Sequence, residues 1–194
     1  MRFAAAILVG LTCLANGDGY RWPLDLPPVL TSSFAEYRPG RYHAGIDLRT
    51  AGVGREVYAP ADGYVSRVRV SPWGYGKALY LQLDDGNTVV FAHLSRFSPA
   101  IEDYVRQVQH KNRDYSVNLF PQAGEFRIAK GQVVAWSGQT GIGFPHLHYE
   151  LRDESQQPFN PRLAGVDWPD TIVPVLRSIL VTPSGPASSV NGDI

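Results

Sequence analysis

The chain has 194 residues, with 18 basic and 18 acidic side chains, and so carries no formal net charge at neutral pH. That length is enough for one domain with a substantial hydrophobic core, and the even charge argues against nucleic acid as a general partner. A single cysteine excludes a disulfide framework, so packing and any bound metal must hold the fold.

The first 17 residues are predicted to be a secretory signal peptide. A basic start precedes the apolar run 3–14, which is too short to span a bilayer, and Ala15 and Gly17 are small, as cleavage requires. A buried helix or a lipid-anchored Cys13 are the alternatives, but neither periodicity nor a lipoprotein cleavage pattern supports them. We therefore expect export to the periplasm, the cell envelope or the exterior.

The next part of the chain is predicted to be rich in β-strands. Residues 18–32 contain many prolines and glycines and are interpreted as an extended lead-in. From about residue 55 to 93, short alternating runs are separated by glycine turns, as expected for strands. The Asp85-Gly86 pair lies between two apolar runs, which is a strong hairpin signal.

Residues 98–112 interrupt this pattern and predict one helix. Ser98-Pro99 can cap and start a helix, and the apolar side chains Ile101, Tyr104, Val105 and Val108 then fall on one face.

Residues 113–126 are interpreted as an irregular insertion, and further short strands are predicted within residues 128–136 and 145–151. Many short strands, glycine turns and one helix indicate a mostly β domain.

The C-terminal tail, residues 164–194, has a different composition. It contains several prolines and one alternating strand over residues 175–182, and Asn191-Gly192 resembles a hairpin turn without its return strand. Because a lone strand is not stable, we expect this tail to pack on the main domain or to begin a second, truncated domain, immunoglobulin-like in kind.

Four of the five histidines lie in three short motifs together with one aspartate. The motifs are His43-Ala-Gly-Ile-Asp47, Phe91-Ala-His93-Leu-Ser and Pro145-His146-Leu-His148-Tyr-Glu150. Two imidazoles and one carboxylate are what a catalytic zinc ion requires when its fourth position stays open for water. Two further histidines can transfer protons near neutral pH.

Taken one at a time, most of these residues have a simpler interpretation. His43 and Asp47 could be a surface pair, although a loop leading into a short strand would bring them to one point. His93 alone is typical of a surface histidine, and His110 is expected to be solvated.

The strand that carries His146 and His148 is more specific, because alternate residues share one face of a strand. His146, His148 and Glu150 then face one way, opposite Leu147 and Tyr149. Leucine and tyrosine suit a core, whereas paired imidazoles suit a wet cleft with a metal or proton-transfer role. Glu150 could orient a ligand from behind or be a surface carboxylate.

In this order the three motifs resemble those of the lysostaphin/LytM-type zinc endopeptidases, which act on peptidoglycan. Framework segments extend the resemblance over roughly residues 30 to 163, and they lie at residues 58–63, 129–134, 137–141 and 160–161. The resemblance implies a peptidase domain over residues 33–163. Its fold would be antiparallel sheets around an open groove, related to the hairpin-built biotinyl and lipoyl carriers.

The resemblance also implies the roles of individual residues. His43, Asp47 and His148 would bind one zinc ion per chain, and His93 and His146 would be the catalytic histidines. Tyr37 lies where some members place a tyrosine that stabilises the transition state. The substrate would be a peptide cross-link of peptidoglycan. The stretch 98–126 is longer than the usual link between motifs and is expected to reshape one wall of the groove.

Two other functions are compatible with parts of the sequence. A non-catalytic relative that binds the cell wall or activates a hydrolase would usually have lost ligands or catalytic histidines, whereas all five positions are present. A biotinyl or lipoyl carrier is suggested by the hairpin sequence at residues 59–63. It would need an acceptor lysine at a hairpin tip, and neither Lys77 nor Lys130 has a convincing context.

Overall fold

A computed structural model describes residues 19–171 together with residues 173, 175 and 185. The predicted signal peptide lies outside the described residues, as does the strand predicted at 175–182 apart from Val175. In the described part of the chain, no helix is both long and apolar enough to cross a membrane.

The described residues are mostly β, and their strands pair antiparallel. Seven strands of the large sheet follow the order β1 (Leu30–Ser32), β4 (Ile46–Arg49), β13 (His146–Arg152), β8 (Thr88–Ala92), β7 (Lys77–Leu83), β6 (Gly63–Val70) and β10 (Val117–Leu119). Two short strands join it from the side, β11 (Arg127–Ile128) on β6 and β14 (Pro158–Phe159) on β13.

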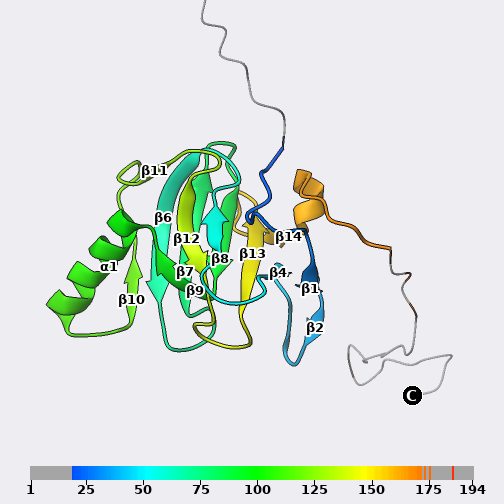
Figure 1. The fold of residues 1–194 in the computed structure, drawn as a ribbon, viewed down its shortest axis with the longest axis horizontal. Helices are drawn as coiled ribbons and strands as arrows, with labels where there is room; N and C mark the ends of the chain where they lie inside the picture. The colour runs from blue at the N-terminus through cyan, green and yellow to red at the C-terminus, as the bar shows by residue number, and fades with distance from the viewer. Residues whose placement is uncertain (1–18, 172, 174, 176–184, 186–194) are drawn as a thin grey trace, which may run out of the picture.

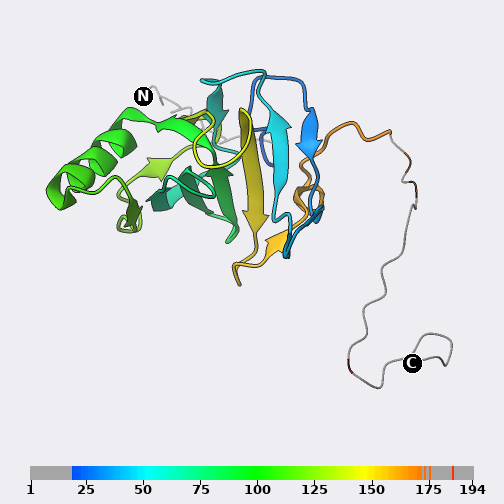
Figure 2. The ribbon, with the colours of Figure 1, turned by 90° about the horizontal axis from the view of Figure 1, so that it is seen from below.

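The remaining elements are smaller. A second sheet has the order β5 (Glu56–Tyr58), β12 (Val133–Ser137) and β9 (Leu94–Phe97), and a hairpin joins β2 (Tyr37–Arg38) to β3 (Arg41–Tyr42). The helices are α1 (Pro99–Asn112) and the 3-10 turn η1 (Pro161–Ala164). Figures 1 and 2 show α1 at one end of the large sheet, beside β10, and the strands β1 and β2 at the opposite end.

The hydrophobic core joins the two larger sheets. Leu147, Tyr149 and Leu151 point into it from β13 and are fully buried, as is Phe91 on the neighbouring β8. Alternate residues of a strand point to opposite faces, so the histidines between these core residues face the other way. The core therefore fixes which face of the large sheet carries the polar site.

The helix begins at Pro99, as predicted, and buries Ile101 and Val105. Ser98 occupies the N-cap position, as predicted, but its side chain makes no capping hydrogen bond. Instead, the Glu102 carboxylate accepts a hydrogen bond of 2.8 Å from the backbone N–H of Phe97. A carboxylate in the first helical turn satisfies a backbone donor there and interacts favourably with the helix dipole.

The insertion after the helix is more regular than predicted. Residues 117–119 form β10, in which Val117 lies opposite Val70 and Leu119 opposite Val68 of β6. Three residues are too few for a periodic signal, and the strand exists because an open sheet edge is available to it. Residues 117–119 thus extend the edge of the large sheet, and none of the residues 98–126 lines the cavity around the histidine motifs. The expected effect of the insertion on the groove stays a prediction.

The lead-in also takes part in the fold. Leu24 is buried in the core, and β1 pairs with β4 and so adds an edge strand beside the site. At the other end of the domain, Val166 is buried against the same core. Packing on the domain thus extends a few residues beyond 33–163 on both sides.

Candidate metal centre and active site

Strands β4 and β13 lie side by side and bring two of the motifs together. Asp47 is directly opposite His148 in the antiparallel register, and Ile46 is opposite Tyr149. Gly45 precedes β4, and a Cβ atom there would lie 2.5 Å from the backbone oxygen of Tyr149. Glycine is required at this close approach, which lets the chain bring His43 over the same point.

His43, Asp47 and His148 form a cluster of three ligand atoms. The Nε2 atom of His43 lies 3.1 Å from Nδ1 of His148. Oδ1 of Asp47 lies 3.0 Å from His148 Nδ1 and 3.2 Å from His43 Nε2. All three side chains are buried, so these atoms face one another in a site largely closed to solvent.

The outer atom of each of these side chains has a separate partner. His43 Nδ1 donates to the backbone oxygen of Ser33 at 2.8 Å, and His148 Nε2 donates to Glu150 Oε2 at 3.0 Å. Arg38 donates to Oδ2 of Asp47 at 2.8 Å. Carbonyl and carboxylate oxygens only accept hydrogen bonds, so when each imidazole is neutral its proton lies on the outer nitrogen and its inner nitrogen keeps the lone pair that a metal would need.

This arrangement fits a zinc ion. Zinc–ligand bonds of about 2.0–2.1 Å in a tetrahedron give ligand–ligand distances of roughly 3.3 Å, close to the distances observed here. Two imidazoles and one carboxylate are a usual ligand set for a zinc ion that keeps one coordination position open. Each ligand is usually oriented by a hydrogen bond to its atom that faces away from the metal.

The buried carboxylates stabilise positive charge at this point. Burial alone would raise the pKa of Asp47, but its contacts with His148 and His43, which are strongest when those imidazoles are protonated, outweigh burial and hold that pKa well below its usual range. Burial likewise acts to raise the pKa of Glu150, and its contacts with His148, Tyr75 and Arg152 lower it. Both carboxylates are therefore anionic at neutral pH and favour a cation between the imidazoles.

His93 and His146 lie together beside the cluster. Their ring centroids are 4.4 Å apart, and Nε2 of His146 is 3.6 Å from Oδ1 of Asp47. His93 Nδ1 donates to the backbone oxygen of Thr140 at 2.9 Å, and His146 Nδ1 donates to that of Phe144 at 2.6 Å. Each ring therefore keeps a lone pair on Nε2, which can accept a proton.

Burial lowers the pKa of His93 to about 4, and the neighbouring His146 and His148 add to the decrease. His93 is therefore neutral at pH 7. Its backbone is in the left-handed region, with φ of 60°, a conformation that is rare outside glycine and concentrated at functional sites.

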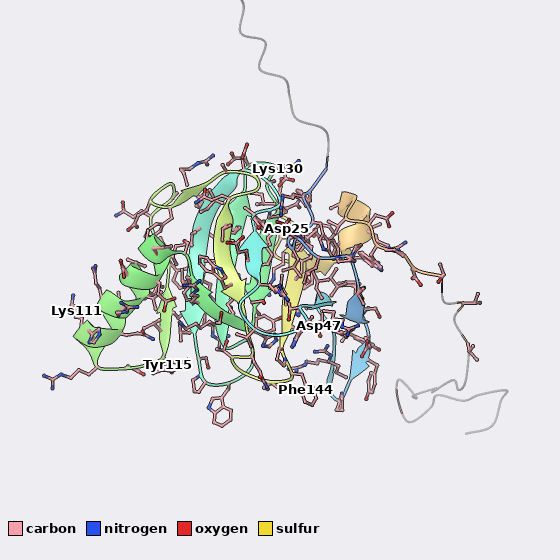
Figure 3. All side chains as sticks on the ribbon, viewed as in Figure 1. Asp25, Asp47, Lys111, Tyr115, Lys130 and Phe144 are labelled. Atoms are coloured by element: carbon pink, nitrogen blue, oxygen red, sulfur yellow. The ribbon has the colours of Figure 1, made fainter. Side chains whose placement is uncertain are left out.

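A cavity of about 460 Å³ is lined by all five residues of the three motifs, namely His43, Asp47, His93, His146 and His148. Figure 3 places Asp47 beside β4 and β13 and Phe144 on the neighbouring loop. His110, by contrast, is exposed on α1, as predicted.

The structure does not bring Tyr37 into this cavity. Tyr37 lies on β2 with 70% of its surface exposed, and its ring packs edge-on against Tyr42 at 6.1 Å. The next residue, Arg38, is the one directed at Asp47. A six-residue spacing from His43 does not fix which side chain of a hairpin points inward, because neighbours alternate.

Two residues of the site were not found from the sequence. Arg38 holds Asp47, and Tyr75 donates a hydrogen bond of 2.7 Å to Oε2 of Glu150 with its ring centroid 4.9 Å from that of His148. Neither belongs to a short motif with the residue it contacts, so no local signal could have identified them.

Comparison with known proteins gives consistent matches. Residues 41–110 match the model of peptidase family M23. The DD-carboxypeptidase/endopeptidase Mpg of Neisseria meningitidis serogroup B is 32% identical over 131 residues, which cover 67% of this chain and 24% of that protein. The chain thus spans about a quarter of the length of the curated relatives it matches.

Solved structures match the fold as well. The catalytic domain of the prophage-encoded M23 protein EnpA from Enterococcus faecalis, solved as a mutant, has a TM-score of 0.51 at 27% identity, covering 70% of this chain and 90% of that one. A zinc-containing peptidase from Vibrio cholerae has a TM-score of 0.54 at 25% identity, covering 79% of this chain and 41% of that one.

Proposed function

This chain belongs to peptidase family M23, and on that basis we propose that it is an exported zinc-dependent endopeptidase that hydrolyses peptide cross-links of bacterial peptidoglycan. The observation that carries the proposal is the His43–Asp47–His148 cluster with two further histidines beside it. The substrate class is supported by the sequence resemblance and by the endopeptidase relatives. Export is supported by the composition of residues 1–17.

In the proposed reaction, the metal would activate the carbonyl and the water, and the histidines of the chain would transfer protons. When bound, zinc polarises a peptide carbonyl and makes water acidic enough to act as a nucleophile near neutral pH. The Nε2 lone pairs of His93 and His146 face the same cavity, so either imidazole can accept a proton from the attacking water. The C–N bond then breaks as a protonated imidazole returns a proton to the leaving amine.

The supporting residues fix these groups. The carbonyls of Thr140 and Phe144 hold the proton on Nδ1 of each catalytic histidine, which keeps Nε2 available. Glu150 and Ser33 do the same for the metal-binding imidazoles from the other side. Tyr37 is left out of the chemical step because it lies outside the cavity.

The first prediction separates metal ligands from catalytic residues. We expect wild-type protein to hold about one zinc per chain and to release peptides from purified peptidoglycan. His148→Ala removes an inner ligand atom, so it should lose the metal and the activity. His146→Ala should keep the metal but lose about 10²–10⁴-fold in rate, as is usual on removing a general acid or base. Metal analysis and a peptide-release assay measure both quantities.

His110→Ala is the matched control, because His110 is exposed on α1. It should behave as wild type in both assays. Zinc bound by wild-type protein without cleavage would favour a wall-binding or hydrolase-activating relative, and a wild-type protein that binds no zinc would overturn the enzyme proposal.

A further inference from the structure

The charged residues around the cavity are unequal in sign. Among the residues that the structure describes, three arginines line it, Arg38, Arg41 and Arg69, against one carboxylate, Asp47. That carboxylate already faces His43 and His148. The cavity wall is therefore strongly positive, and a divalent metal would make it more so.

The three arginines differ in whether the protein already uses them. Arg38 donates to Asp47 Oδ2 at 2.8 Å and to Ser32 Oγ at 3.0 Å. Arg41 and Arg69 are exposed, and within the described part of the chain neither side chain makes a hydrogen bond or an ion pair.

Of the other arginines near this face, Arg67 and Arg152 have protein partners, whereas the exposed Arg49 on β4 does not line the cavity. Arg67 donates to Asn118 at 2.7 Å, and Arg152 donates to Glu150 at 2.6 Å. Two guanidinium groups without a protein partner at a cavity wall are available for an external anion, and guanidinium matches carboxylate in bidentate geometry.

The two arginines flank the ligand cluster from opposite sides. Arg41 lies on the β2–β3 hairpin, whose Arg38 contacts Asp47, and Arg69 lies on β6, three strand positions from β13 in the large sheet. Because neighbouring strands lie about 4.8 Å apart, β6 is roughly 14 Å from β13, a distance that an extended peptide covers in about four residues. Carboxylates bound at both walls would thus lie within a few residues of the bond over the metal ligands.

We propose that the substrate of this site is an acidic peptide whose free carboxylates flank the scissile bond, and that Arg41 and Arg69 bind them. The inference rests on the proposed function and specifies its substrate class. A neutral cross-link made only of glycine would leave both guanidinium groups unused. Long-range attraction by the same charges would also speed the arrival of an anionic peptide at low salt.

The test compares two forms of one substrate. Cross-linked peptide fragments from purified peptidoglycan are used either untreated or with their carboxylates converted to carboxamides by a carbodiimide and ammonia. Wild-type kcat/KM should fall at least about 10-fold on amidation, mainly through a higher KM, since two charge-assisted hydrogen-bonded pairs are lost. Raising the salt concentration should reduce the difference.

The variants assign this preference to residues. Arg41→Ala and Arg69→Ala should each raise KM for the untreated fragment by about 5- to 10-fold and leave the amidated fragment almost unaffected. Arg106→Ala makes the same change of charge on the exposed side of α1 and should leave both substrates unaffected. Equal cleavage of the two fragments by wild-type enzyme would overturn the inference while the peptidase function stood.

A binding measurement keeps the inference testable without catalysis. Fluorescently labelled fragments are titrated into the His146→Ala protein, and anisotropy should show tighter binding of the untreated form. Failure of wild-type protein to cut peptidoglycan would count against the proposed function alone. Equal binding of the two forms would count against the arginines.

Discussion

The two imidazoles of the candidate metal cluster offer different nitrogens because each is held by a different outer contact. The backbone oxygen of Ser33 accepts a hydrogen bond from Nδ1 of His43, whereas the carboxylate of Glu150 accepts one from Nε2 of His148. One ring therefore offers Nε2 and the other Nδ1 to the same point. Such outer contacts set the tautomer and orientation of each imidazole, and with them its function.

Arg38 should affect zinc affinity although it is not a ligand. Arg38→Ala frees Oδ2 of Asp47, so the carboxylate loses its fixed orientation. Loss of such an outer contact typically costs about 10–100-fold in metal affinity, measurable by competition with a chelator. Arg41→Ala is the matched control, since Arg41 lies opposite Arg38 in the hairpin and does not contact Asp47. Equal affinities in the two variants would show that the Arg38 contact does not hold the ligand.

His93 should titrate at an unusually acidic pH. Burial lowers its pKa from 6.5 to about 4, and bound zinc would lower it further by adding positive charge. NMR of the imidazole resonances should therefore show a midpoint well below 6.5. Because the unfolded chain binds the proton more readily, this residue reduces the free energy of unfolding as pH falls from 6.5 to 4. A midpoint near 6.5 would mean that the ring is solvated in solution.

At the level of elements, the pairing of β4 with β13 creates the candidate metal centre. The two strands place Asp47 opposite His148, while Ile46 and Leu48 point into the core beside Leu147 and Tyr149. A shift of one residue would turn the ligands into the core, so the buried face of these strands fixes the register. Stability and metal binding thus depend on the same pairing.

Gly45→Ala should disturb this pairing. The added Cβ would lie 2.5 Å from the backbone oxygen of Tyr149 and 2.9 Å from Cβ of Glu150, so β4 must move away from β13. Overpacking of this kind typically costs about 1–3 kcal/mol, or roughly 2–12 °C in Tm for a domain of this size. Calorimetry and zinc titration should show lower Tm and weaker binding together. Unchanged Tm and affinity would mean that the two strands are not so closely apposed.

For the whole molecule, the proposed metal binding would add to the stability of a core that no disulfide reinforces. The sequence contains one cysteine, and the large and small sheets are joined by one apolar cluster. The three ligands come from positions 43, 47 and 148, which only the folded chain brings together. A ligand that binds only the folded state stabilises it by mass action.

Zinc should therefore raise the Tm of the wild-type protein. At a free concentration 1,000-fold above its Kd, the ion would add about 4 kcal/mol to the free energy of unfolding, or roughly 8–16 °C. His148→Ala should show almost no shift, whereas His110→Ala should show the wild-type shift. Differential scanning calorimetry with and without zinc measures this, and an equal shift in His148→Ala would place the stabilising site elsewhere.

The sequence by itself determined the mostly β class and the helix at residues 99–112, and its resemblance to the lysostaphin/LytM-type endopeptidases implied the ligand set His43, Asp47 and His148, which the structure brings together. Alternation placed His146, His148 and Glu150 on one strand face, and Pro99 marked the start of the helix. The strand and helix predictions were confirmed because strand period and helix start are carried by neighbouring residues.

Only the tertiary structure decided what lies across from each motif. Asp47 and His148 are 101 positions apart, and His93 contacts the carbonyl of Thr140 across 47 positions. The same long-range packing turned Arg38 inward and left Tyr37 outside, formed β10 on an open edge, and left Arg41 and Arg69 facing the cavity. Such contacts depend on the register and twist of the whole sheet, which no local pattern encodes.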